Sequence, residues 1–113
     1  MSKFDECLDL YRASFKEMGA SFNEDTLKAV AKSLGPSIYN ADSSKVSASD
    51  KEELDRVKNN FLIKKLGMAD SAELDNAIKD VVNKFGSSNR NKYRAVFYYL
   101  LAEKFGKLDT YTK

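Results

Sequence analysis

The stretch 87-SSNRNKYRAVFYYLL-101 decides the fold, because it joins a polar, basic front half to one of the most apolar runs in the chain. On a helical wheel, the second half is apolar over most of its circumference. A helix of this kind lies at the centre of its bundle or is buried in an interface. We therefore predict a central helix from about Asn89 to Phe105. Its broad apolar face consists of Tyr93, Val96, Phe97, Leu100 and Leu101.

Three cations, Arg90, Lys92 and Arg94, stand where this helix is expected to begin. The unpaired N–H groups of a helix start favour negative charge, so cations at this position need an explanation. Two explanations are open. In the first, acids of a neighbouring helix neutralise the cations, with Asp75 and Asp80 as candidates. In the second, the surface binds an external phosphate, carboxylate or nucleic-acid backbone.

Tyr99 on the same helix points roughly away from the apolar face. We therefore expect it to contact either the segment 35–49 or another subunit. Together with the polar start of the helix, it defines a candidate surface for an anion or a protein partner. The candidate residues are Ser88, Asn89, Arg90, Asn91, Lys92, Arg94 and Tyr99.

Glycines divide the rest of the chain into helices. Each glycine ends a segment whose apolar residues recur at spacings of three and four, and glycine is favoured just past a helix end. Alternation of polar and apolar residues between hairpin turns is missing from the sequence, so strands are not expected. The pattern predicts an all-α fold, a compact bundle of about five helices, each ended by a C-terminal capping glycine. These glycines are Gly19, Gly35, Gly67, Gly86 and Gly106.

Polar residues predict where several helices begin. Asn23 is expected to cap the second helix. Ser49 and Glu52 have the spacing of a capping box before the third helix. Asp70 and Glu73 have the same spacing before the fourth. The expected helices cover about 2–18, 24–34, 50–66, 70–85 and 89–105.

One long irregular stretch, 35–49, interrupts the helices. Loops of this length in a small domain are often self-packed or functional, so we expect an ordered loop. Within it, Ile38, Tyr39 and Val46 are expected to pack against the bundle. The length of 113 residues suits one domain. We therefore expect a single all-helical domain over 1–107 and a flexible tail over 108–113.

The charge of the chain is nearly balanced but unevenly distributed. The net charge of +2 is too small to indicate a nucleic-acid partner by itself. Residues 84–113, however, contain 7 basic and 2 acidic residues. This basic quarter either packs beside the acidic segment 68–83 that precedes it or presents cations to an anionic partner.

Several kinds of chemistry are excluded by composition. The chain has no histidine, which removes the usual serine and cysteine triads and makes a zinc site improbable. Its glycines are too far apart to form a phosphate-binding loop. Cys7, the single cysteine, is expected to be a small packed residue and not a nucleophile. We therefore expect no enzymatic activity, no cofactor and no metal.

The chain is expected to be cytoplasmic. No apolar run approaches the roughly 20 residues that a membrane span needs. The first ten residues contain acids where a secretory signal has its apolar core. A single cysteine also fits a reducing compartment.

Three strings, LGPSIYNADSSKVS, KNNFLIKKLG and SNRNKYRAVFYYLLAEKFGK, are similar to a small bacterial family, domain of unknown function 2853. The resemblance covers most of the chain, from about Leu34 to Lys107. It implies a single all-helical domain of the bacterial cytoplasm. It implies no activity, and the family offers no catalytic residues to transfer to this chain.

Two functions remain open from the sequence. In the first, the protein is a non-enzymatic binding or interaction domain, with an unknown protein partner or self-association, and the start of the last long helix offers an anion-binding surface. In the second, residues 87–94 belong to a nucleic-acid-binding module similar to a helix-turn-helix. The expected core positions of Tyr93 and Phe97 within that helix favour the first.

Overall fold

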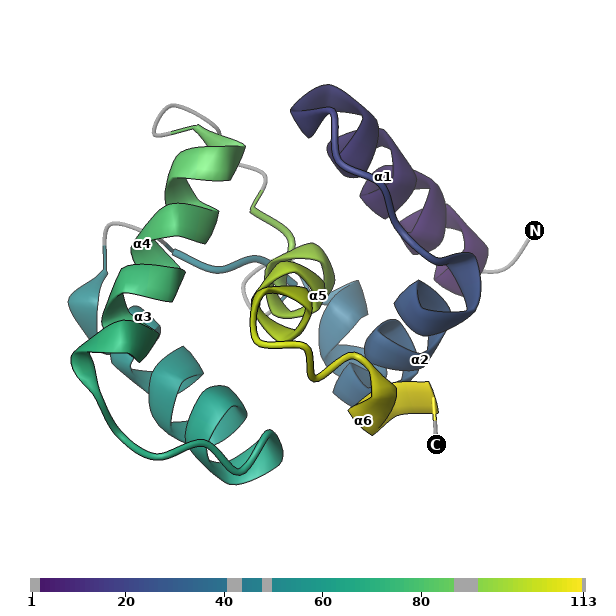
Figure 1. Ribbon diagram of the computed structural model, residues 1–113. Helices are drawn as coiled ribbons and strands as arrows, with labels where there is room; N and C mark the ends of the chain where they lie inside the picture. The colour runs from purple at the N-terminus through teal and green to yellow at the C-terminus, as the bar shows by residue number, and fades with distance from the viewer. Residues whose placement is uncertain (1–2, 41–43, 48–49, 87–91, 113) are drawn as a thin grey trace.

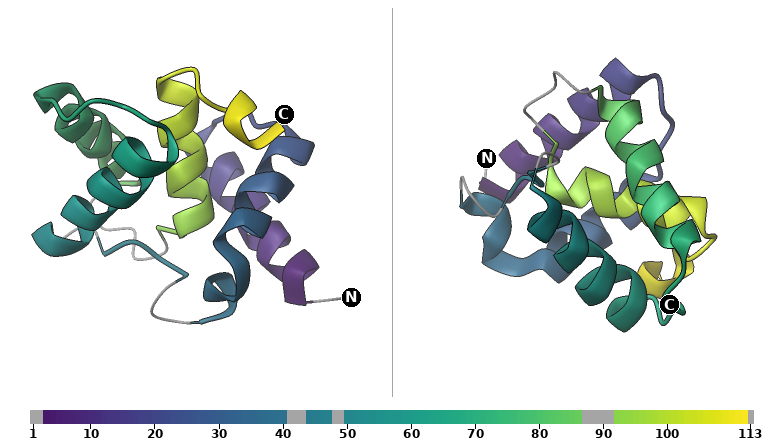
Figure 2. Two further views of the ribbon diagram at one scale, coloured as in Figure 1. Left: turned by 90° about the horizontal axis from the view of Figure 1, so that it is seen from below. Right: turned by 90° about the vertical axis from the view of Figure 1, so that its left-hand side faces the viewer.

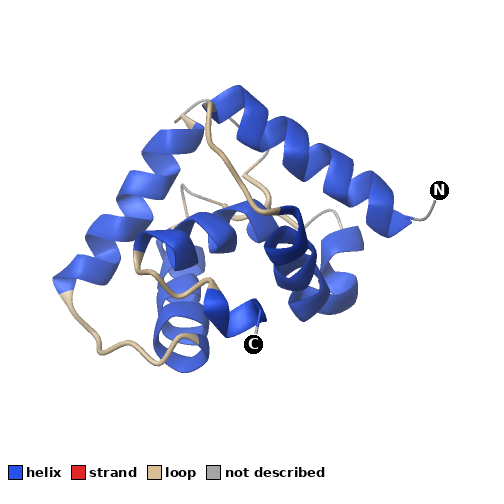
Figure 3. Ribbon diagram, turned by 45° about the vertical axis from the view of Figure 1, so that its right-hand side comes forward, coloured by secondary structure: helices blue, strands red, loops and turns tan. Residues whose placement is uncertain are grey.

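The computed structural model describes residues 3–40, 44–47, 50–86 and 92–112. Within these ranges every regular element is a helix, as Figure 3 shows by colour, so the all-α prediction is confirmed. The radius of gyration is 13.0 Å, which is that of a compact chain of this length. The α-helices are α1 (Lys3–Met18), α2 (Glu24–Leu34), α3 (Lys51–Arg56), α4 (Ala72–Phe85), α5 (Arg94–Lys104) and α6 (Asp109–Thr112). A 3₁₀-helix, η1 (Gly35–Tyr39), follows α2, and a π-helix, η2 (Val57–Lys65), continues α3.

Helix α5 lies at the centre of the molecule, as its apolar circumference predicts. Every residue from Ala95 to Ala102 is buried. Figure 1 shows α1 and α2 on one side of α5, and α3 and α4 on the other. The left view of Figure 2 confirms this order. The fold therefore consists of two helical flanks that meet on one buried helix.

The central helix begins later than predicted. It starts at Arg94, whereas the apolar pattern suggested about Asn89, which lies outside the described residues. Lys92 and Tyr93 precede it and belong to no helix. Tyr93 forms an isolated antiparallel bridge with Lys45. The sequence gives no sign of this bridge, because one pair of residues is too short for an alternating pattern.

The predicted loop, 35–49, begins with a short helix, because residues Gly35–Tyr39 form η1. Ile38 and Val46 are buried, as predicted. The prediction for Tyr39 is wrong, because 46% of this residue is exposed. Ile38 and Tyr39 are adjacent in η1, where successive side chains point about 120° apart, and only Ile38 is buried.

The predicted helix caps are only partly present. Asn23 caps α2 as expected, since its Oδ1 accepts a hydrogen bond from the Thr26 N–H at 3.0 Å. Asp50 caps α3, and its carboxylate accepts a bond from the Glu52 N–H. Ser49, the predicted cap, lies outside the described residues. The predicted capping box at Asp70 is wrong, because α4 begins at Ala72 and Asp70 pairs instead with Lys58.

The five glycines that follow the long helical segments all have positive φ, from 64° to 93°. Gly86 illustrates the geometry at the end of α4. Its φ is 93°, and its N–H donates to the carbonyls of Val82 and Asn83 at 3.1 Å. A residue with a Cβ rarely adopts this conformation, which explains the choice of glycine here.

The third predicted helix is continuous but changes type at Val57. Beyond that residue the turns are wider, and the Leu66 N–H at its end donates to the carbonyl of Phe61, five residues back, at 2.9 Å. π-Helical turns are rare and are frequent at functional sites. Sequence periodicity does not distinguish them from α-helical turns over so short a span.

The C-terminal residues differ from the expected loose tail. Residues Asp109–Thr112 form α6, which packs against α2 (Figure 1). Tyr111 is half-buried, and its ring lies 6.5 Å from that of Phe61. Tyr111 thus packs residues 109–112 against the core, although the polar composition of this segment suggests a tail.

A candidate binding groove and the start of helix α5

The cation at the start of α5 is neutralised from within the protein. Arg94 Nη2 lies 2.5 Å from Glu53 Oε1 of α3, and Nη1 donates to the Tyr98 hydroxyl at 3.0 Å. Both side chains of the ion pair are largely buried, at 16% and 13% exposed. Burial opposes the charge of Arg94, but the hydrogen bonds to Glu53 and Tyr98 outweigh it and raise the pKa of Arg94. Internal pairing therefore explains Arg94.

The acids suggested for this role, Asp75 and Asp80, are not the partners of Arg94. Asp75 pairs with Lys58, with 3.2 Å between its Oδ2 and the lysine Nζ. Asp80 pairs with Lys104 at 3.1 Å. Sequence alone does not identify Glu53 as the partner, because it does not show which helix faces Arg94.

The other described residues of the predicted surface also face inward. Lys92 is only 5% exposed, and its burial lowers the pKa of its ammonium group. Its backbone carbonyl accepts a hydrogen bond from the Val46 N–H at 2.7 Å. The remaining members, Ser88, Asn89, Arg90 and Asn91, lie outside the described residues.

Tyr99 is buried against the first two helices. It is 2% exposed, its ring makes an edge contact with Phe15 of α1, and its hydroxyl accepts a hydrogen bond from the Asn23 N–H at 2.8 Å. Within the described residues these contacts lie outside segment 35–49, and a side chain buried in its own chain offers no surface to another subunit. Helix α1 and the start of α2 cover the face of α5 that the wheel placed opposite the core.

Cys7 is a packed residue, as expected. Its thiol is half-buried and donates a weak hydrogen bond to the Ile38 carbonyl, with 3.7 Å between sulfur and oxygen. Burial raises the pKa of the thiol, which disfavours the thiolate.

A groove opens between α4 and the continuous α3–η2 helix, on the outer side of that flank. Its volume is about 600 Å³. Leu54, which is partly buried, and Ile78, which is only 3% exposed, form its apolar floor, and both belong to the apolar stripes of their helices. Its other lining residues are charged: Lys51, Asp55, Lys58, Asp75 and Lys79.

Lys58 is committed to the protein itself. Its Nζ lies 2.9 Å from Asp70 and 3.2 Å from Asp75, and hydrogen bonds to these two carboxylates raise the pKa of its ammonium group. By contrast, Lys51 and Lys79 are exposed and form no ion pair with any residue that the structure describes. The groove therefore has an apolar surface and two cations available at its edges.

The sequence does not predict this groove, because Lys51 and Lys79 belong to different helices. A usable signal existed in the short connection between the helices of residues 50–66 and 70–85. Short connections produce antiparallel neighbours, whose facing stripes and flanking charges lie side by side.

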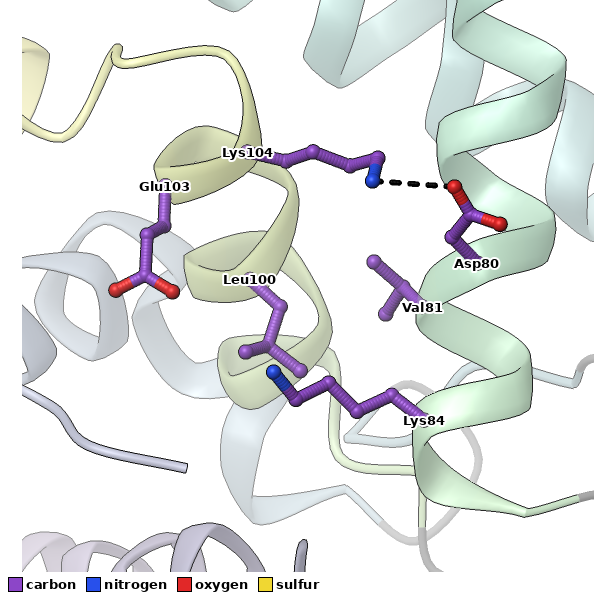
Figure 4. A pocket seen from close by; sticks show the side chains of 6 residues that line it. All are labelled: Asp80, Val81, Lys84, Leu100, Glu103 and Lys104. Carbon is purple, nitrogen blue, oxygen red and sulfur yellow. Dashed lines mark ion pairs between the residues drawn. The ribbon is translucent and has the colours of Figure 1, made fainter. Parts of the chain in front are cut away.

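A second, smaller pocket of about 180 Å³ lies between α4 and α5 (Figure 4). Lys104 reaches across from α5 to Asp80 of α4, and the two side chains pair beside Val81. Lys84 extends from α4 toward Leu100. With less than a third of the volume of the groove, this pocket offers less space to a partner.

Residues 3–40, 44–47, 50–86 and 92–112 contain neither a metal-binding group nor a membrane-spanning helix. No group of three or more cysteine, aspartate or glutamate side chains in these ranges could hold a metal ion. None of the helices there combines the length and apolar character needed to cross a membrane.

Comparison with curated proteins gives no match. A family described as "Protein of unknown function (DUF2853)" matches residues 10–109. The matched span includes most of α1 and the whole of the chain from α2 through α5, so it contains both the groove and the buried helix. This agrees with the resemblance seen in the sequence. The chain belongs to the DUF2853 family of proteins of unknown function.

Proposed function

We propose that this protein is a non-enzymatic binding domain, and that its groove between α3–η2 and α4 holds an acidic, amphipathic helix of a partner protein. One observation carries the proposal. Lys51 and Lys79, which have no ion-pair partner among the described residues, stand beside the apolar surface formed by Leu54 and Ile78.

The shape of the groove favours a helix as its occupant. Lys58 lies beside Asp75, and Leu54 lines the groove with Ile78, so the two helices run in opposite directions. Two adjacent helices leave a furrow between them, and amphipathic helices commonly bind in such grooves through apolar residues at successive turns.

The charges of the groove favour an acidic partner. Lys58 is already neutralised by two carboxylates, which leaves Lys51 and Lys79 as the available cations. Asp55 is exposed and also lines the groove, so it disfavours an acid at its own position. The acids of the partner helix therefore belong beside the two lysines.

Fluorescence anisotropy with a labelled model peptide tests the proposal. The peptide is a helix with leucines along one stripe and glutamates beside it, and we expect saturable binding that weakens with salt. A Lys51→Gln/Lys79→Gln protein should bind it about tenfold more weakly, the effect of losing two exposed ion pairs. A Lys16→Gln/Lys107→Gln protein, which lacks two exposed lysines elsewhere, should bind normally.

Peptide controls separate the apolar and charged contributions. A scrambled peptide of the same composition and a version with lysines in place of glutamates should both fail to bind. Equal binding of the three peptides, or equal affinities of the two double variants, would contradict the proposal.

The nucleic-acid function receives less support from the described residues. Arg94 is paired with Glu53 and Lys92 is buried, so neither presents its charge to a duplex. A DNA duplex titrated under the same conditions tests this alternative. Salt-sensitive DNA binding that the acidic peptide does not displace would favour the helix-turn-helix function over the groove.

A further inference from the structure

A third hollow, of about 120 Å³, lies where α2, η2, α5 and α6 meet. Three aromatic rings line it: Phe61 of η2, Tyr98 of α5 and Tyr111 of α6. Phe61 and Tyr98 stack with their centroids 4.1 Å apart and their planes at 12°. The pocket thus has an aromatic wall that belongs to the buried core.

Tyr111 provides a second wall that is nearly parallel to the first. Its ring makes an angle of 23° with Phe61, and the two centroids are 6.5 Å apart. This spacing is that of an offset pair of stacked rings. The hollow therefore has aromatic rings on two sides.

A cation stands beside the aromatic walls. Lys65 Nζ lies 5.4 Å from the centroid of the Tyr111 ring, and within the described residues this lysine forms no ion pair. Its neighbour Lys64 is equally exposed but does not line the pocket. Asn60 and Ser33 add polar groups at the same site.

We propose that this pocket binds a small molecule made of one aromatic ring that carries a carboxylate. The ring packs among Phe61, Tyr98 and Tyr111, and the carboxylate pairs with Lys65. The hollow, at about 120 Å³, is smaller than the cavity of about 150 Å³ that encloses benzene, but it is open to solvent, so the ring enters it only in part and the carboxylate stays at the surface beside Lys65. The site is separate from the groove, since the two share no lining residue.

Benzoate is the probe for this site, and nitrogen–proton correlation spectra of the whole protein are the measurement. We expect saturable shift changes at Asn60, Lys65, Tyr98 and Tyr111, with millimolar affinity, as is usual for so small a ligand. Cyclohexanecarboxylate keeps the charge without the aromatic ring, and benzyl alcohol keeps the ring without the charge. Both should bind more weakly than benzoate.

Matched variants test the role of the cation. Lys65→Gln should weaken benzoate binding about fivefold, the effect of one exposed ion pair, while Lys64→Gln should leave it unchanged. Both lysines are exposed, so neither change threatens folding. The groove variant Lys51→Gln/Lys79→Gln should also bind benzoate normally, which keeps this test independent of the proposed function.

Three results would overturn the inference. The first is that no resonance shifts saturably with benzoate. The second is that the shifts cluster away from the four named residues. The third is that Lys65→Gln and Lys64→Gln have the same affinity for benzoate.

Discussion

At the scale of single residues, Tyr99 joins the central helix to the first flank. Its ring packs against Phe15, and its hydroxyl accepts the N–H of Asn23, the residue that caps α2. One side chain therefore fills core volume and also satisfies a backbone donor at a helix start, where donors lack partners within the helix.

Replacing Tyr99 by phenylalanine removes only the acceptor. We expect the free energy of unfolding to fall by about 0.5–1.5 kcal/mol, the net contribution of one intramolecular hydrogen bond, because the Asn23 N–H loses its partner. Urea unfolding followed by circular dichroism measures the change. Tyr39→Phe, at an exposed position, is the matched control and should change stability by less than about 0.5 kcal/mol. Equal effects of the two substitutions would show that the Tyr99 hydrogen bond does not contribute.

The Arg94–Glu53 pair makes a second prediction at this scale. Glu53→Gln leaves a largely buried guanidinium without its counter-charge, so we expect a loss of about 1–3 kcal/mol. Glu52→Gln is the control, because the Glu52 side chain is 85% exposed and its one ion pair, with Arg56, is long at 3.9 Å. A double-mutant cycle with Arg94→Met measures the coupling directly. A coupling energy near zero would contradict the pairing.

At the scale of elements, α1 and α2 are linked by an ion pair as well as by packing. Arg12 of α1 donates to both carboxylate oxygens of Glu24 in the first turn of α2. The hydrogen bonds from Arg12 lower the pKa of Glu24, although partial desolvation opposes them.

This shift predicts how the link depends on pH. A carboxylate with a lower pKa in the folded state adds stability above its ordinary pKa of about 4.3, and loses it as the pH falls through the folded value. Wild-type protein should therefore be more stable than Glu24→Gln at neutral pH. The difference should shrink toward zero in acid, as measured by urea unfolding at a series of pH values. Glu17→Gln, at an exposed position on α1, should show no such trend. A Glu24→Gln difference that does not change with pH would contradict the link.

Sequence predicts some elements better than others, for physical reasons. The stripes of α1, α2 and α4 repeat over several turns, so their existence follows from periodicity alone. The bridge between Lys45 and Tyr93 depends on contacts between residues 48 positions apart, which leave no local pattern. The same holds for η2, whose wider turns span only nine residues.

At the scale of the whole molecule, α5 is the common core and each flank packs on a different face of it (Figure 1). The central place of α5 was predictable, because the apolar circumference of 95–102 requires cover on all sides. The candidate site was less predictable. Cations at the start of α5 stand out in the sequence, but Glu53 closes on Arg94 only after folding. Lys51 and Lys79 stand out only once α3 and α4 lie side by side.

We propose that the groove between α3–η2 and α4 binds an acidic helix. Nuclear magnetic resonance can map directly where the acidic peptide binds on the protein. Nitrogen–proton correlation spectra are recorded while the unlabelled acidic peptide is added. We expect the largest peptide-induced shift changes at Lys51, Leu54, Ile78 and Lys79. These shift changes should disappear in the Lys51→Gln/Lys79→Gln protein. Shift changes centred on α1 and η1, or none at saturating peptide, would contradict it.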